Sequence, residues 1–123
     1  MGNDSCISIN QGLSMSLFNK KCEACSKDTP PLKGEEITNF FNQIDQGWKL
    51  VDEHHIVREY KFKDFNSALE FTNRVGALAE EEGHHPDIFL TWGQVTLTLF
   101  THKIDGLSES DFIFASKCDQ IET

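Results

Sequence analysis

Apolar residues recur along this chain with two different periods, and the points where the period changes divide it into elements. Ile37, Phe40, Phe41 and Ile44 fall at i, i+3, i+4 and i+7, which predicts a helix with one apolar face. Alternation replaces that spacing in "WKLV" and "HIVREYKF", on either side of "DEHH". These two segments are rich in β-branched and aromatic residues, and they predict a β-hairpin.

The helical period returns in "DFNSALEFTNRVGALAEEEG", the longest predicted helix. Asp64 has the side chain of an N-cap, and Gly83 followed by Pro86 predicts where the helix ends. The apolar stripe of this helix is broad, which predicts that it is well buried. It consists of Phe65, Ala68, Leu69, Phe71, Thr72, Val75, Leu78 and Ala79.

A second hairpin and a third helix complete the chain. "DIFLTW" and "QVTLTLFTH" alternate around Gly93, and the second strand is predicted to end at His102. Phe100 and His102 share a face of that strand because strand side chains alternate. Ser108 and Asp111 have the spacing of a capping box at the start of "SESDFIFASKCDQIE". The order α-β-β-α-β-β-α, with hairpin-connected strands, predicts an α+β fold.

Length and local composition predict one domain behind an N-terminal arm. The chain has 123 residues, which is the length of one domain. Residues 1–32 are rich in Ser, Asn, Gly and Pro, show little periodicity and contain a CxxC, so we expect a flexible arm. Residues 33–123 are the expected domain.

The acidic composition narrows the possible partners. Eleven Lys and Arg stand against twenty Asp and Glu, which gives a formal net charge of −9 and repels phosphate backbones. Direct nucleic-acid binding is therefore not expected. No apolar run approaches the roughly 20 residues that cross a bilayer, and the N-terminus lacks the features of a secretory signal. We expect a cytoplasmic protein without a membrane partner.

The cysteines carry a motif of their own. Cys6, Cys22, Cys25 and Cys118 do not have the spacing of a disulfide framework. Cys22 and Cys25 form a CxxC, which is half of a zinc site or a redox pair. No second CxxC accompanies it, and it does not lie between a strand and a helix. Reduced cysteines in an arm are therefore favoured over zinc or redox chemistry.

Four polar residues are candidates for proton transfer. His84 and His85 lie at the exit of the long helix, His102 at the end of the last strand and Asp111 in the first turn of the last helix. Histidine has the unperturbed pKa nearest neutrality, which suits it to acid–base catalysis. Each residue also has a structural alternative. A histidine can interact with the last carbonyls of a helix or lie half-exposed on a strand, and an aspartate can simply cap a helix.

Metal binding is a second interpretation of the histidines, and the spacing disfavours it. Neighbouring side chains in an extended segment point to opposite sides, so His84 and His85 are poorly placed to share one ion. The chain also lacks a helical HxxxH. The two remaining histidines, His54 and His55, lie in the first hairpin turn, where we expect surface residues.

The combination resembles a known family. The pattern E-x3-H-H-P-x5-W is present as Glu80, His84, His85, Pro86 and Trp92, followed by "TH" at His102 and "GLSESD" ending in Asp111. This set is similar to the motif of the pterin-4a-carbinolamine dehydratase family, which is also the dimerization-cofactor family of animals. The resemblance covers about residues 33–118, and the "CEAC" arm is similar to that of bacterial members.

The resemblance implies a fold, a reaction and partners. The fold is a two-layer α+β sandwich with three helices on one face of a four-stranded antiparallel sheet, assembled into a homodimer or homotetramer. The reaction converts 4a-hydroxytetrahydropterin to quinonoid dihydropterin and water, which recycles the pterin of aromatic amino acid hydroxylases. It implies no metal or organic cofactor, a small-molecule pterin substrate and a functional coupling to such a hydroxylase.

The family motif also implies roles for individual residues. His84, His85, His102 and Asp111 form the expected catalytic set. His85 is the first choice for binding the pterin and assisting departure of the hydroxyl, while His84 and His102 exchange protons with the hydroxyl and a ring nitrogen. Asp111 is expected to orient a histidine, with His102 as the first choice.

The expected substrate-binding residues are Glu80, His85, Pro86 and Trp92. Trp92 is expected either to stack on the pterin or to pack in the core. The resemblance leaves a second class of function open, a protein-interaction or dimerization module as in animal members. A molybdopterin-related role, as proposed for some bacterial relatives, is a third. The presence of all three histidines with Asp111 favours an enzyme, because a binding module does not need them.

Overall fold

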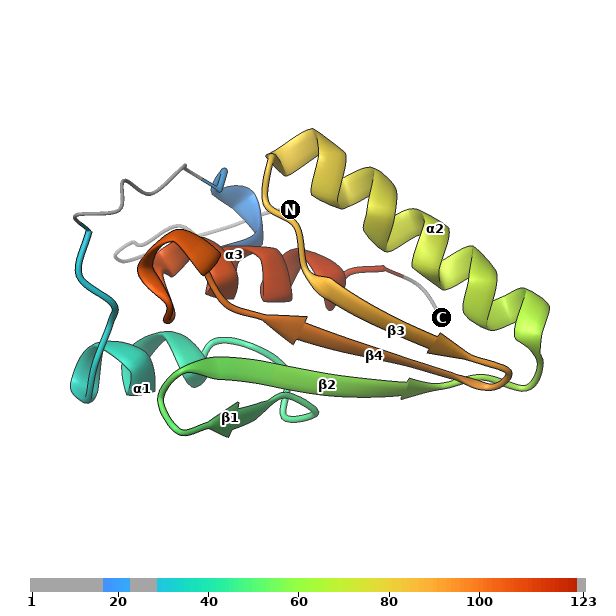
Figure 1. Ribbon diagram of the computed structural model, residues 1–123, viewed down its shortest axis with the longest axis horizontal. Helices are drawn as coiled ribbons and strands as arrows, with labels where there is room; N and C mark the ends of the chain where they lie inside the picture. The colour runs from blue at the N-terminus through green and yellow to red at the C-terminus, as the bar shows by residue number, and fades with distance from the viewer. Residues whose placement is uncertain (1–16, 23–28, 122–123) are drawn as a thin grey trace, which may run out of the picture.

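The computed structural model describes residues 17–22 and 29–121, which form a four-stranded antiparallel sheet with helices on one face (Figure 1). The elements are α1 (Glu35–Phe41), β1 (Lys49–Val51), β2 (His55–Lys61), α2 (Phe65–Glu82), β3 (Asp87–Thr91), β4 (Gln94–Leu99) and α3 (Glu109–Cys118), with 3-10 helices η2 (Leu17–Asn19) and η3 (His102–Ile104). The predicted α+β class, the element order and the antiparallel sheet are confirmed. None of the helices in these residues is both long and apolar enough to span a bilayer.

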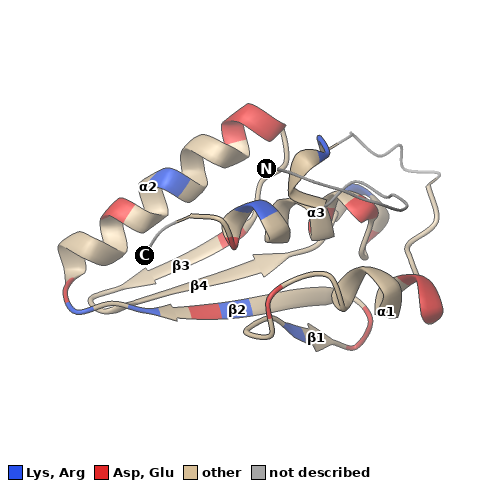
Figure 2. Cartoon of the chain, turned by 180° about the vertical axis from the view of Figure 1, so that it is seen from behind, with Lys and Arg blue, Asp and Glu red and all other residues tan. Residues whose placement is uncertain are grey.

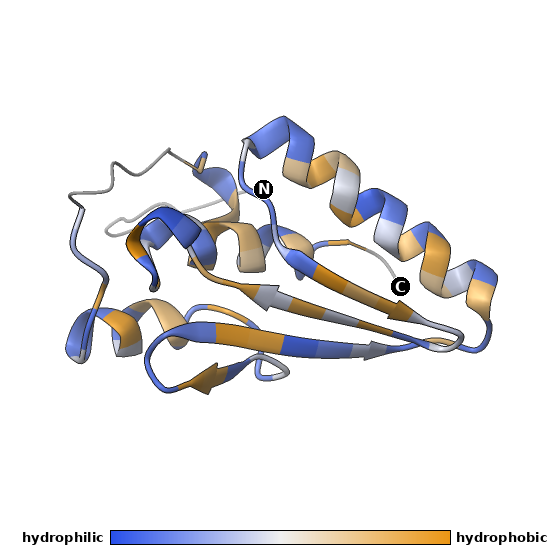
Figure 3. Ribbon diagram, in the orientation of Figure 1, coloured by the Kyte–Doolittle hydropathy of each residue, from blue (hydrophilic) through white to orange (hydrophobic). Residues whose placement is uncertain are grey.

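The strand order β1-β2-β4-β3 leaves β1 and β3 at the edges of the sheet. On the central strand β4, the alternation predicted from sequence separates two faces. Val95, Leu97 and Leu99 are fully buried against the helices, while the residues between them are only half-buried. The hydropathy colouring in Figure 3 shows the same mixture of hydrophobic and hydrophilic positions along the strands and α2. The sheet therefore has one covered face and one more open face.

Helix α2 begins and ends as its sequence predicts. The Asp64 carboxylate accepts a hydrogen bond from the Ser67 N–H at 2.8 Å, and Gly83 closes the helix in the left-handed conformation with φ of 66°. The prediction that the whole apolar stripe is buried is wrong at two positions. Phe65 is 44% exposed and Leu69 36% exposed, because only one side of the helix packs against the sheet.

The last strand is shorter than predicted. It ends at Leu99, and His102 begins a 3-10 turn instead of ending the strand. The physical reason is a local closure in which the Thr101 N–H donates to the Gly106 carbonyl at 2.8 Å, so the chain folds back on itself. Asp105 completes that turn with φ of 50°. His102 is consequently presented from a tight turn at the end of the sheet.

Residues 17–22 of the N-terminal arm lie against the domain. Leu17 belongs to the hydrophobic core, the Lys20 ammonium lies 2.7 Å from the Glu109 carboxylate, and the Cys22 N–H donates to Glu82 at 2.9 Å. Residues 1–16 and 23–28 of the arm, which include Cys6 and Cys25, lie outside the described residues.

Glu82, two residues before His84, contacts two other segments of the chain. Its side chain is 2% exposed, and it accepts from the Cys22 N–H and from Lys117 Nζ at 3.1 Å. It is one of several acidic residues at the end of α2, as Figure 2 shows. Burial acts to raise the pKa of Glu82, but the hydrogen bonds from Cys22 and Lys117 and the Lys117 charge outweigh burial and lower it.

The Glu82→Gln variant is expected to lose about 2 kcal/mol of unfolding free energy at pH 7, because the Lys117 ammonium loses its partly buried counter-charge. A carboxyl whose folded-state pKa is depressed stabilises the fold above its unfolded pKa and loses that contribution as pH falls through the folded-state pKa. The difference from wild type should therefore shrink below about pH 4.5. Urea unfolding between pH 3 and 7 measures it.

The matched control is Glu81→Gln, at an exposed position next to Glu82. It should change the unfolding free energy by less than about 0.5 kcal/mol. A pH-independent loss in Glu82→Gln would contradict the ionic explanation.

Candidate active site

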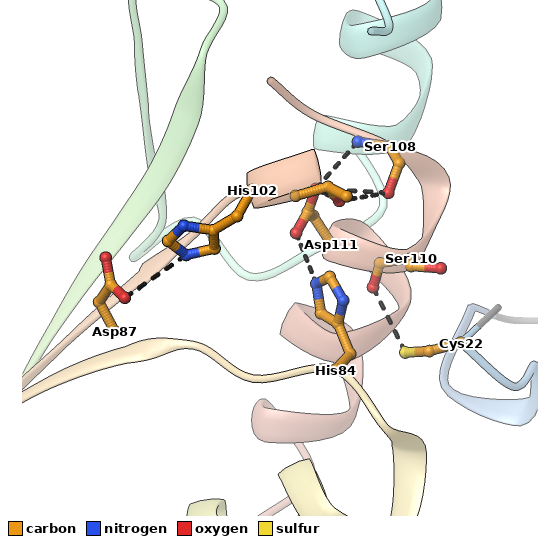
Figure 4. A network of polar contacts seen from close by, with 8 residues as sticks. Cys22, His84, Asp87, His102, Ser108, Ser110 and Asp111 are labelled. Atoms are coloured by element: carbon orange, nitrogen blue, oxygen red, sulfur yellow. Dashed lines mark hydrogen bonds and ion pairs between the residues drawn. The ribbon is translucent and has the colours of Figure 1, made fainter. Parts of the chain in front are cut away.

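His84 and Asp111 form a short polar contact at the exit of α2. His84 Nε2 lies 2.6 Å from Asp111 Oδ1, although the two residues are 27 positions apart (Figure 4). The His84 side chain is 13% exposed and the Asp111 side chain is fully buried. The ring of His84 also packs near Phe114 of α3, with centroids 5.9 Å apart. The end of one helix and the start of another therefore meet through a short charge-assisted contact.

The second oxygen of Asp111 is held by the start of α3. Asp111 Oδ2 accepts from the Ser108 N–H at 2.9 Å and from Thr101 Oγ1 at 2.9 Å, with Ser108 Oγ at 3.4 Å. This is the capping box predicted from the sequence, and it is confirmed. The two carboxylate oxygens have separate duties, one at the helix cap and one at the histidine.

This arrangement determines how His84 carries its proton. An ionised carboxylate only accepts hydrogen bonds, so the nitrogen that faces Asp111 Oδ1 must be the donor. In a neutral imidazole the other nitrogen is then an acceptor. His84 therefore presents Nδ1 as a base, and a positive charge that arrives on the ring is balanced by a buried carboxylate.

His102 lies beside this pair but does not share its carboxylate. The expectation that Asp111 orients His102 is wrong, because Asp111 contacts His84. His102 is connected to Asp111 through its chain neighbour Thr101, and its own acidic partner is Asp87, with Nε2 to Oδ1 at 3.6 Å. Figure 4 shows the His102 ring pointing toward Asp87. The segments around residues 84–87 and 101–102 are therefore linked directly by Asp87 and His102, and indirectly through Asp111.

His85 has a different partner from His84 and a more exposed position. Its side chain is 60% exposed, against 13% for His84, and its Nε2 lies 2.6 Å from Glu80 Oε2. Pro86 follows it and is half-buried. Glu80 is thus brought to His85, and both side chains are open to solvent. A ligand at His85 is reached without opening the fold.

Trp92 is the one predicted site residue that the fold does not bring to the histidines. It lies in the β3–β4 turn, at the far end of β3 from Asp87, and five residues of strand separate two points by about 17 Å. Its side chain is 68% exposed, so the alternative expectation of core packing is also wrong for this chain.

Three contributing residues were missed by reasoning from sequence: Asp87, Thr101 and Ser108. The spacing predicts Ser108 only as a cap residue, and Thr101 is a buried threonine directly before His102. Asp87 lies two residues after His85, and this short spacing could have indicated a partner for a histidine. The buried contacts of Thr101 depend on the turn to Gly106, which no periodicity in the sequence indicates.

Neither a metal cluster nor an activated thiol accompanies these residues in the described part of the chain. No group of three or more metal-ligating side chains is placed to hold an ion there. Burial, followed by the charge of Glu82, raises the pKa of the Cys22 thiol to about 12. Burial also raises the pKa of the Cys118 thiol. These two cysteines therefore stay protonated and unreactive at neutral pH.

Comparisons with family models and with known proteins point to the same family. Residues 30–121 match the sequence model of the family described as pterin 4 alpha carbinolamine dehydratase. A protein of Alkaliphilus metalliredigens with the provisional name pterin-4-alpha-carbinolamine dehydratase is 58% identical over 104 residues, which are 85% of this chain and 94% of that protein. A protein of Rubrobacter xylanophilus with the same provisional name is 54% identical over 85% of this chain and 97% of its own length.

Two solved structures share the architecture. A crystal structure of a transcriptional coactivator/pterin dehydratase from Brucella melitensis superposes with a TM-score of 0.67 at 36% identity, covering 72% of this chain and 95% of that chain. A pterin dehydratase-like protein, described as a RuBisCO assembly factor in the alpha-carboxysome, gives a TM-score of 0.51 at 24% identity over 60% and 87% of the two chains. The second likeness shows the fold alone.

Proposed function

The chain belongs to the pterin-4a-carbinolamine dehydratase family, and from this premise we infer that it is a hydro-lyase that removes water from a 4a-hydroxytetrahydropterin. The single observation that carries the mechanism is the 2.6 Å contact between His84 Nε2 and the buried carboxylate of Asp111. Asp111 keeps the proton of a neutral His84 on Nε2, so that Nδ1 is free to act as the base. The rest of the proposal concerns which histidine acts at which atom.

The reaction needs one base and one acid. The C4a–O bond breaks, the departing hydroxyl takes up a proton and leaves as water, and a ring N–H gives its proton to the enzyme as the quinonoid double bond forms. One proton is gained and one is lost, so no oxidant or reductant is required. Groups that titrate near neutrality suit both steps, and each typically contributes about 10²- to 10⁴-fold.

His84 is the proposed base for the ring nitrogen. Its Nδ1 accepts the proton, and Asp111 stabilises the imidazolium through Nε2. Asp111 does not touch the substrate in this scheme, because its second oxygen is committed to Ser108 and Thr101. It acts as a positioning residue for His84.

His85 and His102 are the proposed groups at the hydroxyl. Both are about three-fifths exposed, and each has a carboxylate partner, Glu80 for His85 and Asp87 for His102. A protonated imidazole next to a carboxylate donates to the departing hydroxyl while its charge remains balanced. Glu80 contacts His85 and Pro86 follows it in the chain, and the two are the proposed substrate contacts together with His85.

The test uses chemically generated 4a-hydroxytetrahydropterin with the appearance of the quinonoid product followed by absorbance. Wild type is expected to accelerate the dehydration, and His85→Ala and His102→Ala are each expected to lower kcat by about 10²-fold. Lys103→Ala, an exposed neighbour of His102, serves as the control and should retain activity. If both histidine variants dehydrate at the wild-type rate while folded, this assignment fails.

We also propose that the protein is a homo-oligomer. The edge strand β3 exposes Ile88 at 37% and Phe89 at 63%, and α2 exposes Phe65 and Leu69 on its outer side. An open edge carrying large apolar side chains is a site for pairing with a second sheet. This supports a dimer through β3, and a tetramer through α2 if the helix surfaces also pair.

The dimerization role remains the alternative within the same scaffold. The Brucella relative is described both as a transcriptional coactivator and as a pterin dehydratase. The exposed apolar residues on α2 suit such a partner as well as a second copy. The buried Asp111–His84 pair favours the enzyme, because a docking surface does not require a charge pair below it.

A further inference from the structure

A row of aromatic rings lies where β2 begins and β4 ends. The Phe100 ring is tilted against two histidine rings, with its centroid 4.2 Å from that of His102 and 4.8 Å from that of His54. His55 stands further out, at 6.3 Å from Phe100. We call His54, Phe100 and His102 the ring stack. His54, expected to be a surface residue of the hairpin turn, has a side chain that is 34% exposed and lies beside Phe100.

His102 has little else to fix its orientation. Its side chain is 61% exposed, and its carboxylate partner Asp87 is 3.6 Å away, beyond a good hydrogen-bond distance. An exposed histidine with one long polar contact is free to change rotamer. The Phe100 ring, with its centroid 4.2 Å from that of His102, is therefore a second constraint on the imidazole.

His54 is fixed by polar contacts of its own. Its Nε2 lies 2.7 Å from Asp105 Oδ1, and its Nδ1 lies 3.0 Å from His55 Nδ1. Asp105 closes the same turn that begins at His102, because its N–H donates to the His102 carbonyl at 3.2 Å. His54 is thus connected to His102 in two ways, through the Phe100 ring and through the backbone of the turn.

We propose that His54 and Phe100 are positioning residues that hold the imidazole of His102 in its reactive orientation. This inference rests on the proposed function of His102. It assigns no contact with substrate to either residue. The expected consequence is a loss in the proton-transfer step with little change in substrate binding, since misplacing a catalytic group costs rate more than affinity.

The kinetic test compares Phe100→Leu, Phe100→Tyr and His54→Ala. Phe100→Leu is expected to lower kcat about tenfold with KM changed less than threefold, and Phe100→Tyr, which keeps the ring, to stay within threefold of wild type. His54→Ala should lower kcat about fivefold. Phe62→Leu is the matched control, because it removes a partly buried ring at the opposite end of the sheet, next to Gly93.

The second readout is independent of activity. The NMR resonances of the His102 ring protons, assigned by their loss in His102→Gln, should shift in Phe100→Leu and in His54→Ala but not in Phe62→Leu. If wild type proves inactive, the proposed function fails, and these shifts still decide whether the stack orients His102. Unmoved His102 resonances, wild-type kcat in Phe100→Leu, or an equal loss of kcat in Phe62→Leu would each overturn the proposal. Should Phe100→Leu not fold, His54→Ala decides by the same two readouts.

Discussion

Replacing Asp111 by asparagine is expected to lower the dehydratase kcat by about 10²- to 10³-fold while the protein stays folded. The reason lies in which atoms can donate. The Ser108 N–H faces Oδ2 and can only donate, so the amide oxygen must take that position. The amide NH2 then faces His84 Nε2 and donates to it, which moves the histidine proton to Nδ1. His84 loses both its free acceptor and its counter-charge.

The measurement is a double-mutant cycle with His84→Gln under the same absorbance assay. Since Asp111 acts through His84, the double variant should be no slower than the slower single variant. Ser108→Ala is the matched control, because it weakens the same helix cap by about 1 kcal/mol but leaves the His84 tautomer unchanged. Full additivity of the two losses would show that Asp111 acts independently of His84, and activity within fivefold of wild type in Asp111→Asn would remove it from the mechanism.

Replacing Asp119 by alanine is expected to have the largest effect on stability, a loss of about 3 to 5 kcal/mol of unfolding free energy. The Asp119 carboxylate is 10% exposed and accepts three hydrogen bonds, from Arg58 Nη1 at 2.7 Å, Trp48 Nε1 at 2.8 Å and the Asp45 N–H at 3.0 Å. Its removal leaves a partly buried guanidinium without its main partner. It also leaves the indole N–H of a tryptophan that is 2% exposed without an acceptor.

Urea unfolding followed by circular dichroism checks this value, with Asp45→Ala as the control. Asp45 also pairs with Arg58, at 3.3 Å, but its side chain is 50% exposed. An exposed ion pair contributes at most about 1 kcal/mol, so the control should lose no more than that. Equal losses in the two variants would mean that burial is not what makes Asp119 important.

Features that depend on neighbouring residues could be predicted from the sequence. Asp64, Gly83 and Pro86 act on the backbone within a few residues of themselves, so the limits of α2 could be read directly. The capping box at Ser108 and Asp111 is equally local. The two hairpins followed from alternation and turn residues, and so did the order of helices and strands along the chain.

Features that depend on distant segments could not be predicted. Asp111 meets His84 only because the start of α3 packs beside the exit of α2, and no spacing in the chain specifies which histidine it reaches. The capping motif uses one carboxylate oxygen and gives no sign of where the other points. The shorter β4 and the exposure of Phe65 and Leu69 likewise result from which surfaces meet in three dimensions.

The double duty of Asp111 has a consequence for evolution. The same carboxylate starts helix α3 and partners His84, so selection on folding alone is enough to retain it. A lineage that abandoned the reaction and kept the scaffold for another purpose would lose the aspartate late, if at all. His84 has no cap to maintain, and its side chain is free to drift once catalysis no longer matters. Among descendants of this fold, the residue at position 84 therefore indicates better than the residue at position 111 whether the reaction is retained.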